Sequence, residues 1–167
     1  KRFKARASDG ADNSLVNIIE CKECNFAWQY PLQRTLSESE EFFSEAYADE
    51  GETVSDYFNP ARKREIAELE FGFLQKICPN PGKLLDVGAG AGIFAELAAG
   101  KGWRVTAVDP ALDEKMIKNT LVKPIKGTIE NLSEEDMYDV ITMWDVIEHA
   151  MNPIDLILCA KKHLNKG

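Results

Sequence analysis

The chain has 167 residues, of which 20 are Lys or Arg and 28 are Asp or Glu, so its formal net charge is −8. A hydrophobic share of 44% and a charged share of 29% are typical of a folded globular protein and exclude a disordered or fibrous chain. The acidic total argues against a general binder of nucleic-acid phosphates, and no apolar run is long enough to span a membrane.

The first section, residues 1–30, holds two strand-like runs on either side of the Cys21-Lys22-Glu23-Cys24 pair. Such a pair forms one knuckle of a zinc ribbon, so Cys21 and Cys24 are candidate metal ligands. Structural zinc needs four ligands and no second pair follows, so two free thiols on a hairpin are the alternative. Four cysteines in all are too few for a disulfide framework, which favours a reducing, cytoplasmic location.

The second section, residues 31–59, is acidic and leads into the main part of the chain. Between Ser37 and Tyr47, aromatic residues recur at roughly helical spacing, which predicts a helix. The polar stretch from Asp49 to Asn59 predicts a linker.

The third section, residues 60–167, begins with a helical pattern. Pro60 suits a first helical position, with Asn59 as the N-cap. The basic run from Arg62 to Arg64 is interpreted as a solvated helix face. The apolar stripe expected on this helix consists of Ile66, Leu69, Phe73, Leu74 and Ile77.

Four strands are expected in this section, at residues 84–87, 103–108, 122–125 and 140–144. Pro124 confines the third strand to an edge, because proline cannot donate a ladder hydrogen bond. Helical patterns lie between and after the strands. This alternation predicts an α/β fold, a doubly wound parallel sheet with helices on both faces, preceded by the small Cys-x-x-Cys hairpin.

Three helices are expected to cover the sheet besides the first. One follows a glycine-rich loop and is marked by Phe94 and Ala98, and a second spans residues 112–119. Asn152 and Pro153 open the last one. The apolar face of that last helix is expected to consist of Ile154, Ile157 and Leu158, and His163 near its end is expected to be structural.

The glycine-rich loop follows the first strand directly. Gly88, Gly90 and Gly92 stand between an apolar strand and a helix, where a ligand can lie against bare backbone. Ile93 stands where a dinucleotide-binding fingerprint has Gly or Ala, and a tight turn is the alternative interpretation. Asp109 ends the next strand, where a carboxylate can accept ribose hydroxyls or, alternatively, form the turn before Pro110.

These segments together resemble the class I S-adenosylmethionine-dependent methyltransferase family, whose sheet is Rossmann-like. Residues 85–92 are similar to its first signature and residues 108–110 to its second. Residues 129–132 match its third region, and residues 138–153 resemble its fourth strand with the Glu-His…Pro segment that follows. A subset of the family also has an N-terminal zinc-ribbon-like Cys-x-x-Cys segment, with a first Cys pair upstream.

The resemblance implies S-adenosylmethionine as the cofactor. Gly88 and Gly90 would approach its methionine part and ribose, and Asp109 its ribose hydroxyls. Thr128 and Ile129 would touch the adenine edge, although the family more often has Asp where Thr128 stands. The full set of residues placed at the cofactor is Asp86, Gly88, Ala89, Gly90, Gly92, Asp109, Pro110, Thr128, Ile129 and Trp144.

The candidate catalytic residues are Asp145, Glu148 and His149, in the loop after the fourth strand. Some O-methyltransferases with a similar segment bind a divalent metal there, and Asp, Glu and His supply suitable oxygen and nitrogen ligands. His149 acting alone as a general base is the second interpretation. In the third interpretation, Glu148 and His149 cap the loop and support the fold without a role in chemistry.

The expected activity is methyl transfer from S-adenosylmethionine to a small-molecule, glycan or lipid-linked acceptor, with O-methylation favoured. The alternatives are a non-catalytic methyltransferase-like binding module and an NAD-dependent oxidoreductase. A nucleic-acid partner is not expected. Four strands are fewer than the family's complete sheet, so we expect the natural protein to be longer. If a chain of this length is stable, the open edge of its apolar fourth strand predicts a homodimer.

Overall fold

The structure is a computed structural model that describes residues 2–6, 15–25, 27–29, 60–150 and 152–166. The chain divides into two units, Lys1–Phe43 and Ser44–Gly167. The expected acidic helix and linker, at residues 31–59, lie outside the described residues. No helix in the described ranges has both the length and the apolar character needed to cross a bilayer.

The N-terminal unit contains an antiparallel sheet with the strand order β1-β2-β3. The strands are β1 (Arg2–Arg6), β2 (Leu15–Glu20) and β3 (Ala27–Gln29). β2 and β3 correspond to the two strand-like runs of the sequence, and Glu20 pairs with Ala27 at the turn that carries the two cysteines. β1 was not expected.

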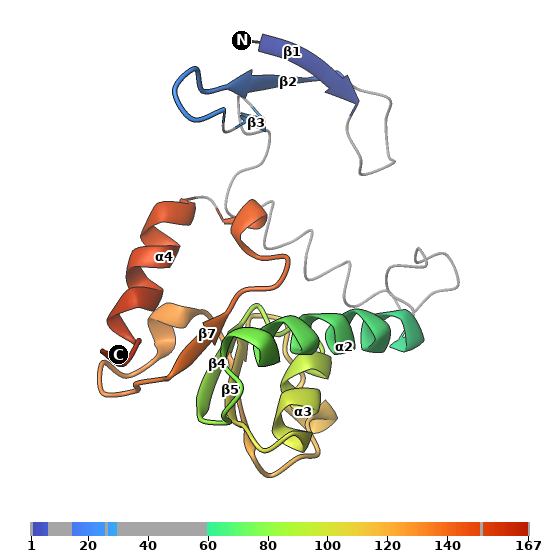
Figure 1. The fold of residues 1–167 in the computed structure, drawn as a ribbon, viewed down its shortest axis with the longest axis vertical. Coiled ribbons are helices and arrows are strands. Elements are labelled where there is room, and N and C mark those ends of the chain that lie inside the picture. The colour runs from blue at the N-terminus through green and yellow to red at the C-terminus, as the bar shows by residue number, and fades with distance from the viewer. Residues whose placement is uncertain (1, 7–14, 26, 30–59, 151, 167) are drawn as a thin grey trace. The chain divides into compact units, whose positions relative to one another are not determined.

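The second unit is built on a parallel sheet with the strand order β6-β5-β4-β7 (Figure 1). Its strands are β4 (Lys83–Val87), β5 (Arg104–Asp109), β6 (Val122–Lys126) and β7 (Val140–Thr142). The chain runs outward from β4 to β6 and then returns to β7 on the other side of β4. This reversal confirms the doubly wound fold, with Pro124 on the edge strand as expected.

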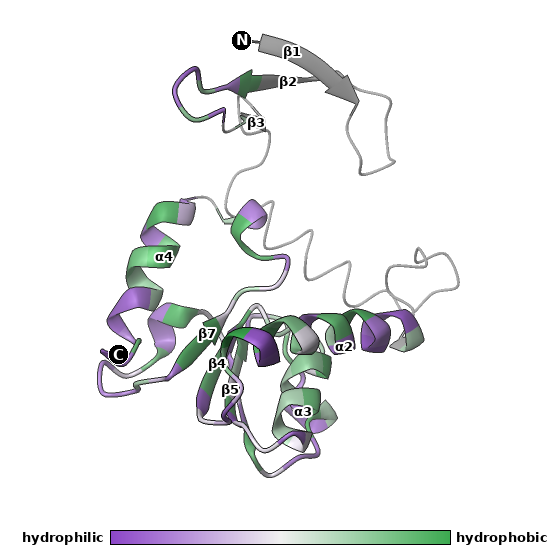
Figure 2. Cartoon of the chain, in the orientation of Figure 1, coloured by the Kyte–Doolittle hydropathy of each residue, from purple (hydrophilic) through white to green (hydrophobic). Residues whose placement is uncertain are grey.

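Helices cover both faces of this sheet (Figures 1 and 2). α2 (Pro60–Ile77) and α3 (Ile93–Gly100) pack on the face that includes Leu84, and α4 (Pro153–Lys162) packs on the face that includes Leu85. Successive side chains of a strand point to opposite faces, so the apolar run of β4 serves both cores. Each of these fully buried leucines contributes about 1.5–3 kcal/mol to stability.

The stripe expected on α2 is only partly correct, because Leu74 is buried but three other members are exposed. Leu69, Phe73 and Ile77 are 76%, 57% and 64% exposed, and the buried face carries Ala67 and Phe71 beside the expected Leu74. The small Ala67 side chain lets α2 approach α3, and this packing decides which face turns inward. Counting only large apolar residues therefore placed the stripe on a neighbouring face.

The helix expected at residues 112–119 is also wrong. The structure has a single turn of 3-10 helix there, η2 (Glu114–Met116). Asp113 caps this turn by accepting a hydrogen bond from the Lys115 amide (3.0 Å), and Ile117 is already extended.

α4 begins after Asn152 as expected, but Ile154, Ile157 and Leu158 are exposed rather than packed on the sheet. The helix meets the core through Leu156, Cys159 and Ala160. His163 is buried, with Nδ1 lying 3.0 Å from the Asp136 carbonyl oxygen, which confirms its structural role.

Candidate functional site

The glycine-rich loop connects β4 to α3 in a conformation that favours glycine. Gly88, Gly90 and Gly92 have φ values of 72°, 53° and 75°, in the left-handed region. The Gly88 and Ala89 amides donate hydrogen bonds to the Val108 carbonyl oxygen, at 2.8 and 3.2 Å. The loop is therefore fixed to β5 at the carboxyl edge of the sheet.

Close packing also restricts two of these positions to glycine. A Cβ atom at Gly88 would collide with the Val146 side chain, and one at Gly92 with the Ile117 side chain. The loop thus has bare backbone at the start of α3, as a ligand-binding loop requires.

Asp109 lies beside this loop at the end of β5. Its Oδ2 accepts a hydrogen bond from the Gly90 amide (2.9 Å), and its Oδ1 accepts one from the Ala111 amide (2.7 Å). A carboxylate has about four lone-pair sites, so each oxygen retains capacity for a ligand hydroxyl. Pro110, next in the chain, is exposed.

Thr128 and Ile129 follow β6 near the same edge. The Gly127 amide donates to the Asp109 carbonyl oxygen (3.0 Å), which brings this segment beside β5. The Thr128 amide donates to Asn131 Oδ1 (2.7 Å) at the start of η3 (Ile129–Asn131). Thr128 is exposed, whereas the Ile129 side chain is buried in the core on the α4 side.

Asp86 is buried in β4 and links two strands. Its Oδ1 accepts a hydrogen bond from Thr142 Oγ1 (2.8 Å) on the neighbouring β7. Burial raises the pKa of Asp86 to about 7; the Thr142 hydrogen bond opposes this rise, and the charges of Glu70 and Asp109 add to it. The carboxyl group therefore joins β4 to β7 at the point where the strand order reverses.

Asp86→Asn is expected to remove a pH-dependent loss of stability. Because the pKa of Asp86 is raised in the folded protein, the native state binds more protons than the unfolded state between about pH 4 and 7, and stability falls as pH rises. At pH 8 the variant should be more stable than the wild type by up to about 4 kcal/mol, and at pH 4 nearly equal to it. Urea unfolding at both pH values measures this difference.

Asp139 provides a control of opposite sign. The Lys83 amide and Asn165 donate hydrogen bonds to its exposed carboxylate, which lowers the pKa of Asp139. Asp139→Asn should therefore lose more stability at pH 8 than at low pH. Destabilisation by Asp86→Asn at both pH values would contradict the expected role of Asp86.

Trp144 follows β7 and packs between two phenylalanines. Its ring meets Phe73 of α2 edge-on at a centroid distance of 6.4 Å, and Phe94 of α3 at 5.5 Å. Within the described part of the chain, its buried Nε1 has no hydrogen-bond acceptor. A buried donor without a partner costs about 1–3 kcal/mol, so this N–H is a candidate contact for a ligand.

The loop after β7 carries the candidate catalytic residues. Asp145 has a φ of 51°, and η4 (Ile147–His149) follows it. The His149 amide donates to the Val146 carbonyl oxygen (3.0 Å), which holds the turn. The side chains of Asp145, Glu148 and His149 are exposed.

The divalent-metal expectation does not fit these residues. No three His, Cys, Asp or Glu side chains among the described residues gather closely enough to hold a metal ion. Asp145, Glu148 and His149 share a loop but do not form a metal-binding group.

The two cysteines lie in the turn between β2 and β3. The backbone amides of Cys24 and Glu23 donate to the Cys21 thiol and, with the Cys24 side chain, lower its pKa. Zinc needs four ligands, and within the described ranges no group of three or more His, Cys, Asp or Glu side chains could hold a metal ion. Cys21 and Cys24 therefore do not form a complete zinc site in this structure.

Two residues of α2 near the candidate site were not identified from the sequence. Lys63 and Glu70 are half-buried, whereas Arg62 and Arg64 are exposed. Burial and the charge of Asp145 raise the pKa of Glu70 to about 7, although the charge of Lys63 opposes the rise. Arg62 and Arg64 thus lie on a solvated face as expected, whereas Lys63 is partly covered. The sequence indicated this difference, because Lys63 lies at helical spacing from the buried Ala67 and Leu74.

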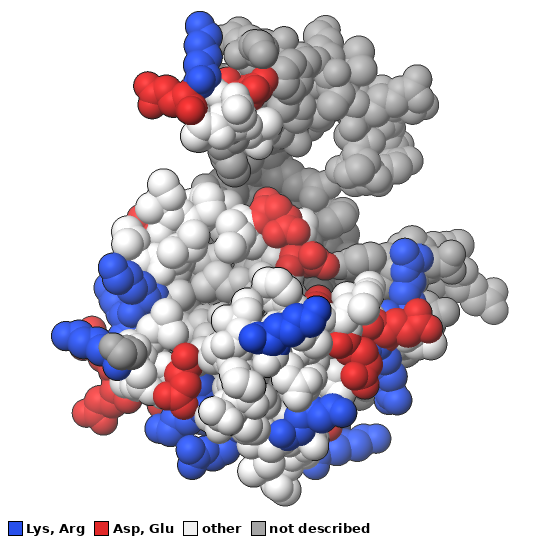
Figure 3. Space-filling view, in the orientation of Figure 1, with Lys and Arg blue, Asp and Glu red and all other residues white. Residues whose placement is uncertain are grey.

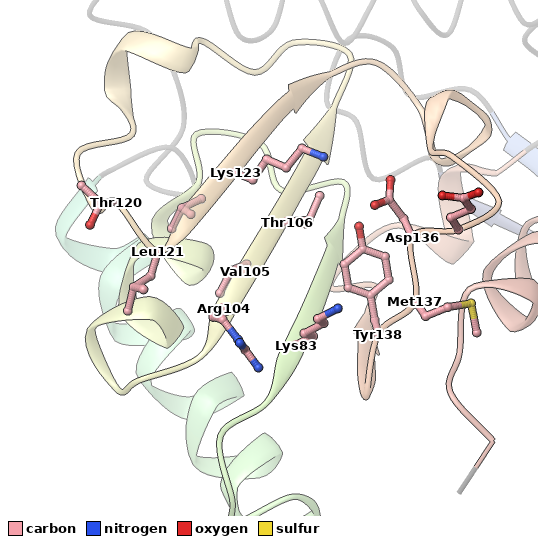
Figure 4. Close-up of a pocket in the computed structure, with 12 residues that line it drawn as sticks. Lys83, Arg104, Val105, Thr106, Thr120, Leu121, Lys123, Asp136, Met137 and Tyr138 are labelled. Carbon is pink, nitrogen blue, oxygen red and sulfur yellow. The ribbon is translucent and has the colours of Figure 1, made fainter.

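A separate hollow lies at the opposite, amino edge of the sheet (Figure 4). Its volume is about 350 Å³, and its lining includes Lys83, Arg104, Thr106 and Tyr138. The charges of Lys83 and Arg104 also act on Asp139. The glycine-rich loop and Asp109 lie at the carboxyl ends of these strands, so the hollow is not the candidate site.

The family was identified by comparison with known proteins. The model of a family described as a methyltransferase domain matches residues 58–167. The chain belongs to this methyltransferase-domain family. The match covers the whole parallel sheet and its three helices.

Relatives of this methyltransferase domain carry the name ubiquinone biosynthesis O-methyltransferase. The protein from Rickettsia akari is 35% identical over 89 residues, which are 49% of this chain and 36% of that protein. The mitochondrial protein from Schizosaccharomyces pombe is 31% identical over 119 residues, which are 65% of this chain and 42% of that protein. The chain thus spans less than half the length of these curated relatives.

Solved structures of methyltransferases show the same fold. The plantazolicin methyltransferase BpumL in complex with SAH gives a TM-score of 0.54 at 23% identity, covering 75% of this chain and 54% of that one. The 1,6-didemethyltoxoflavin-N1-methyltransferase of Burkholderia thailandensis gives 0.60 at 17% identity, covering 90% and 65%.

Proposed function

We propose that this methyltransferase domain binds S-adenosylmethionine and supports transfer of its methyl group to a hydroxyl of a small-molecule acceptor. The observation that carries the proposal is the carboxylate of Asp109 beside the glycine-rich loop, at the carboxyl edge of the sheet. The family match and the name of the curated relatives support methyl transfer to oxygen.

Six of the candidate residues have a proposed role in contacting the cofactor or supporting those contacts. Asp109 accepts hydrogen bonds from the ribose hydroxyls, and the backbone at Gly88 and Gly90 lies against the methionine part and ribose. Thr128 contacts the adenine edge, and the buried position of Ile129 supports that segment from beneath. The unpartnered indole N–H favours a direct contact of Trp144 with the ligand.

The sulfonium group of the bound cofactor supplies an already activated methyl group. The protein must then hold the acceptor oxygen in line with that methyl group, exclude water and remove the hydroxyl proton. His149 is the proposed general base, because a neutral imidazole nitrogen can accept a proton and the side chain is exposed in the loop after β7.

His149→Asn is expected to lower kcat by about 10²–10⁴-fold with an acceptor hydroxyl that is neutral at pH 7, because the proton would lack its acceptor. The dissociation constant of S-adenosylmethionine should not change. Glu134→Gln, at an exposed position outside this loop, serves as the control. Equal kcat values for the two variants would exclude His149 as the base.

Separate calorimetric titrations of S-adenosylmethionine and NAD test the cofactor. Saturable binding of S-adenosylmethionine alone is the expected result. Binding of NAD alone would overturn the proposal in favour of an oxidoreductase. Binding of neither ligand by the folded protein would favour a non-catalytic binding module.

The charge distribution supports a small-molecule or glycan acceptor over nucleic acid. On the face in Figure 3, Lys and Arg side chains are interspersed with Asp and Glu rather than gathered into one basic patch. The formal net charge of −8 has the same implication. A cytoplasmic location and a homodimer remain predictions of the sequence.

A further inference from the structure

The inward edge of α2 carries two charged residues. Lys63, Ala67, Glu70 and Leu74 follow one another at spacings of four, three and four residues, so they share one face of the helix. Ala67 and Leu74 are buried, whereas Lys63 and Glu70 are half-buried at the edge of that face. The two charged side chains start two helical turns apart, about 10 Å along the axis.

This edge of α2 faces the carboxyl ends of the strands. Phe73, three residues after Glu70, packs against Trp144, which directly precedes Asp145. The charge of Lys63 interacts with those of Asp145, Asp109 and Glu70. The charge of Glu70 in turn acts on the buried Asp86.

Among the described residues, the site therefore combines the ammonium group of Lys63 with four carboxyl groups. The carboxyl groups come from four elements: β4 (Asp86), β5 (Asp109), α2 (Glu70) and the loop after β7 (Asp145). Burial lowers the pKa of Lys63 and raises those of Glu70 and Asp86 to about 7. Trp144, which directly precedes Asp145 in the chain, has a buried indole N–H, and its ring contacts Phe73 of α2 and Phe94 of α3. These charges favour a ligand that carries net positive charge.

We propose that Lys63 and Glu70 form a charge-selective roof over the cofactor site and that Glu70 favours the sulfonium cofactor over its thioether product. This inference rests on the proposed function. In the transfer, the acceptor oxygen bonds to the methyl carbon, and the electron pair of the breaking carbon–sulfur bond stays on sulfur. The acceptor proton passes to a base. The bound ligand thereby changes from a net charge of +1 to zero.

Glu70 would respond to this change of charge. A cationic ligand stabilises the ionised form of Glu70, so binding near neutral pH releases a proton. The affinity for the sulfonium should rise by up to about tenfold between pH 6 and pH 8. The affinity for the neutral thioether should rise less, because that ligand has one positive charge fewer. Lys63 has a different role: its ammonium attracts the α-carboxylate, which both ligands have.

The test compares S-adenosylmethionine with S-adenosylhomocysteine by equilibrium binding to the full chain at pH 6 and pH 8. Glu70→Gln is expected to reduce the preference for the sulfonium by about tenfold at pH 8 and to flatten its pH dependence. Glu68→Gln is the matched control, because Glu68 is exposed on the same helix. Lys63→Gln should lower the affinity for both ligands by a similar factor. Lys76→Gln, at an exposed position, should change the affinity for neither.

The possible results separate the roof from the proposed function. If the wild type binds both ligands and Glu70→Gln matches Glu68→Gln in preference and pH dependence, the roof is overturned and the cofactor assignment stands. If the folded wild type binds neither ligand, the proposed function fails and the roof fails with it. Unfolding curves of the four variants confirm that each comparison is made on folded protein.

Discussion

Asp109→Ala should weaken S-adenosylmethionine binding by at least about a hundredfold. The substitution removes the proposed ribose acceptor and also leaves the amides of Gly90 and Ala111 without the carboxylate that holds them. Each lost hydrogen bond of this kind costs about 1–3 kcal/mol, and a hundredfold loss of affinity corresponds to about 2.7 kcal/mol. Asp109→Asn retains one acceptor oxygen and should lose less affinity. Calorimetric titration measures both losses.

Asp113→Ala is the matched control for this prediction. Asp113 is exposed in the next turn of the chain, and it too accepts a hydrogen bond from a backbone amide, that of Lys115. The Asp113→Ala substitution should lower the free energy of unfolding and leave the affinity for S-adenosylmethionine unchanged. Similar affinities for the Asp109 and Asp113 variants would exclude a direct role of Asp109 in binding.

Gly88→Ala and Gly72→Ala make the same chemical change with opposite expected effects on stability. Gly88 has a φ of 72°, and a Cβ there would collide with Val146. The left-handed strain and the overpacking together should destabilise the protein by about 2–4 kcal/mol and disturb the ligand loop. Gly72 lies within α2, and an added Cβ there would meet nothing within 4 Å apart from its chain neighbours and the nearby backbone of its own helix. Alanine at this position should therefore raise the free energy of unfolding by about 0.5–1 kcal/mol.

Urea unfolding of the two alanine variants measures these changes. A further variant, Gly88→Ala combined with Val146→Ala, removes the collision but leaves the positive φ. It should recover part of the lost stability. No difference between Gly88→Ala and Gly72→Ala would show that the loop tolerates a side chain.

The parts of the site that could be predicted from the sequence are those with local causes. A strand, a glycine-rich turn and a helix follow one another within residues 84–100, so Gly88 and Gly90 fell at the carboxyl edge as expected. Asp109 ends its strand, and a parallel sheet brings that end beside the loop. These placements need the order of elements and no long-range packing.

Long-range contacts explain what the sequence could not predict. Residues 112–119 have a helical pattern, yet Glu96 Oε1 of α3 accepts hydrogen bonds from the amides of Lys118 and Asn119. Those amides then cannot bond to carbonyls one helical turn earlier, so only the short turn η2 forms. Lys63 and Glu70 were missed for a similar reason, since the packing of Ala67 against the core sets the rotation of α2.

The indole of Trp144 gives the protein an optical reporter at the carboxyl edge of its sheet. Its emission depends on the polarity and hydrogen bonding around a ring that contacts both α2 and α3. The other two tryptophans, Trp28 of β3 and the buried Trp103 just before β5, contribute a background signal. A ligand that meets the Trp144 N–H should therefore shift the fluorescence spectrum without any attached label, and Trp144→Phe should abolish that shift.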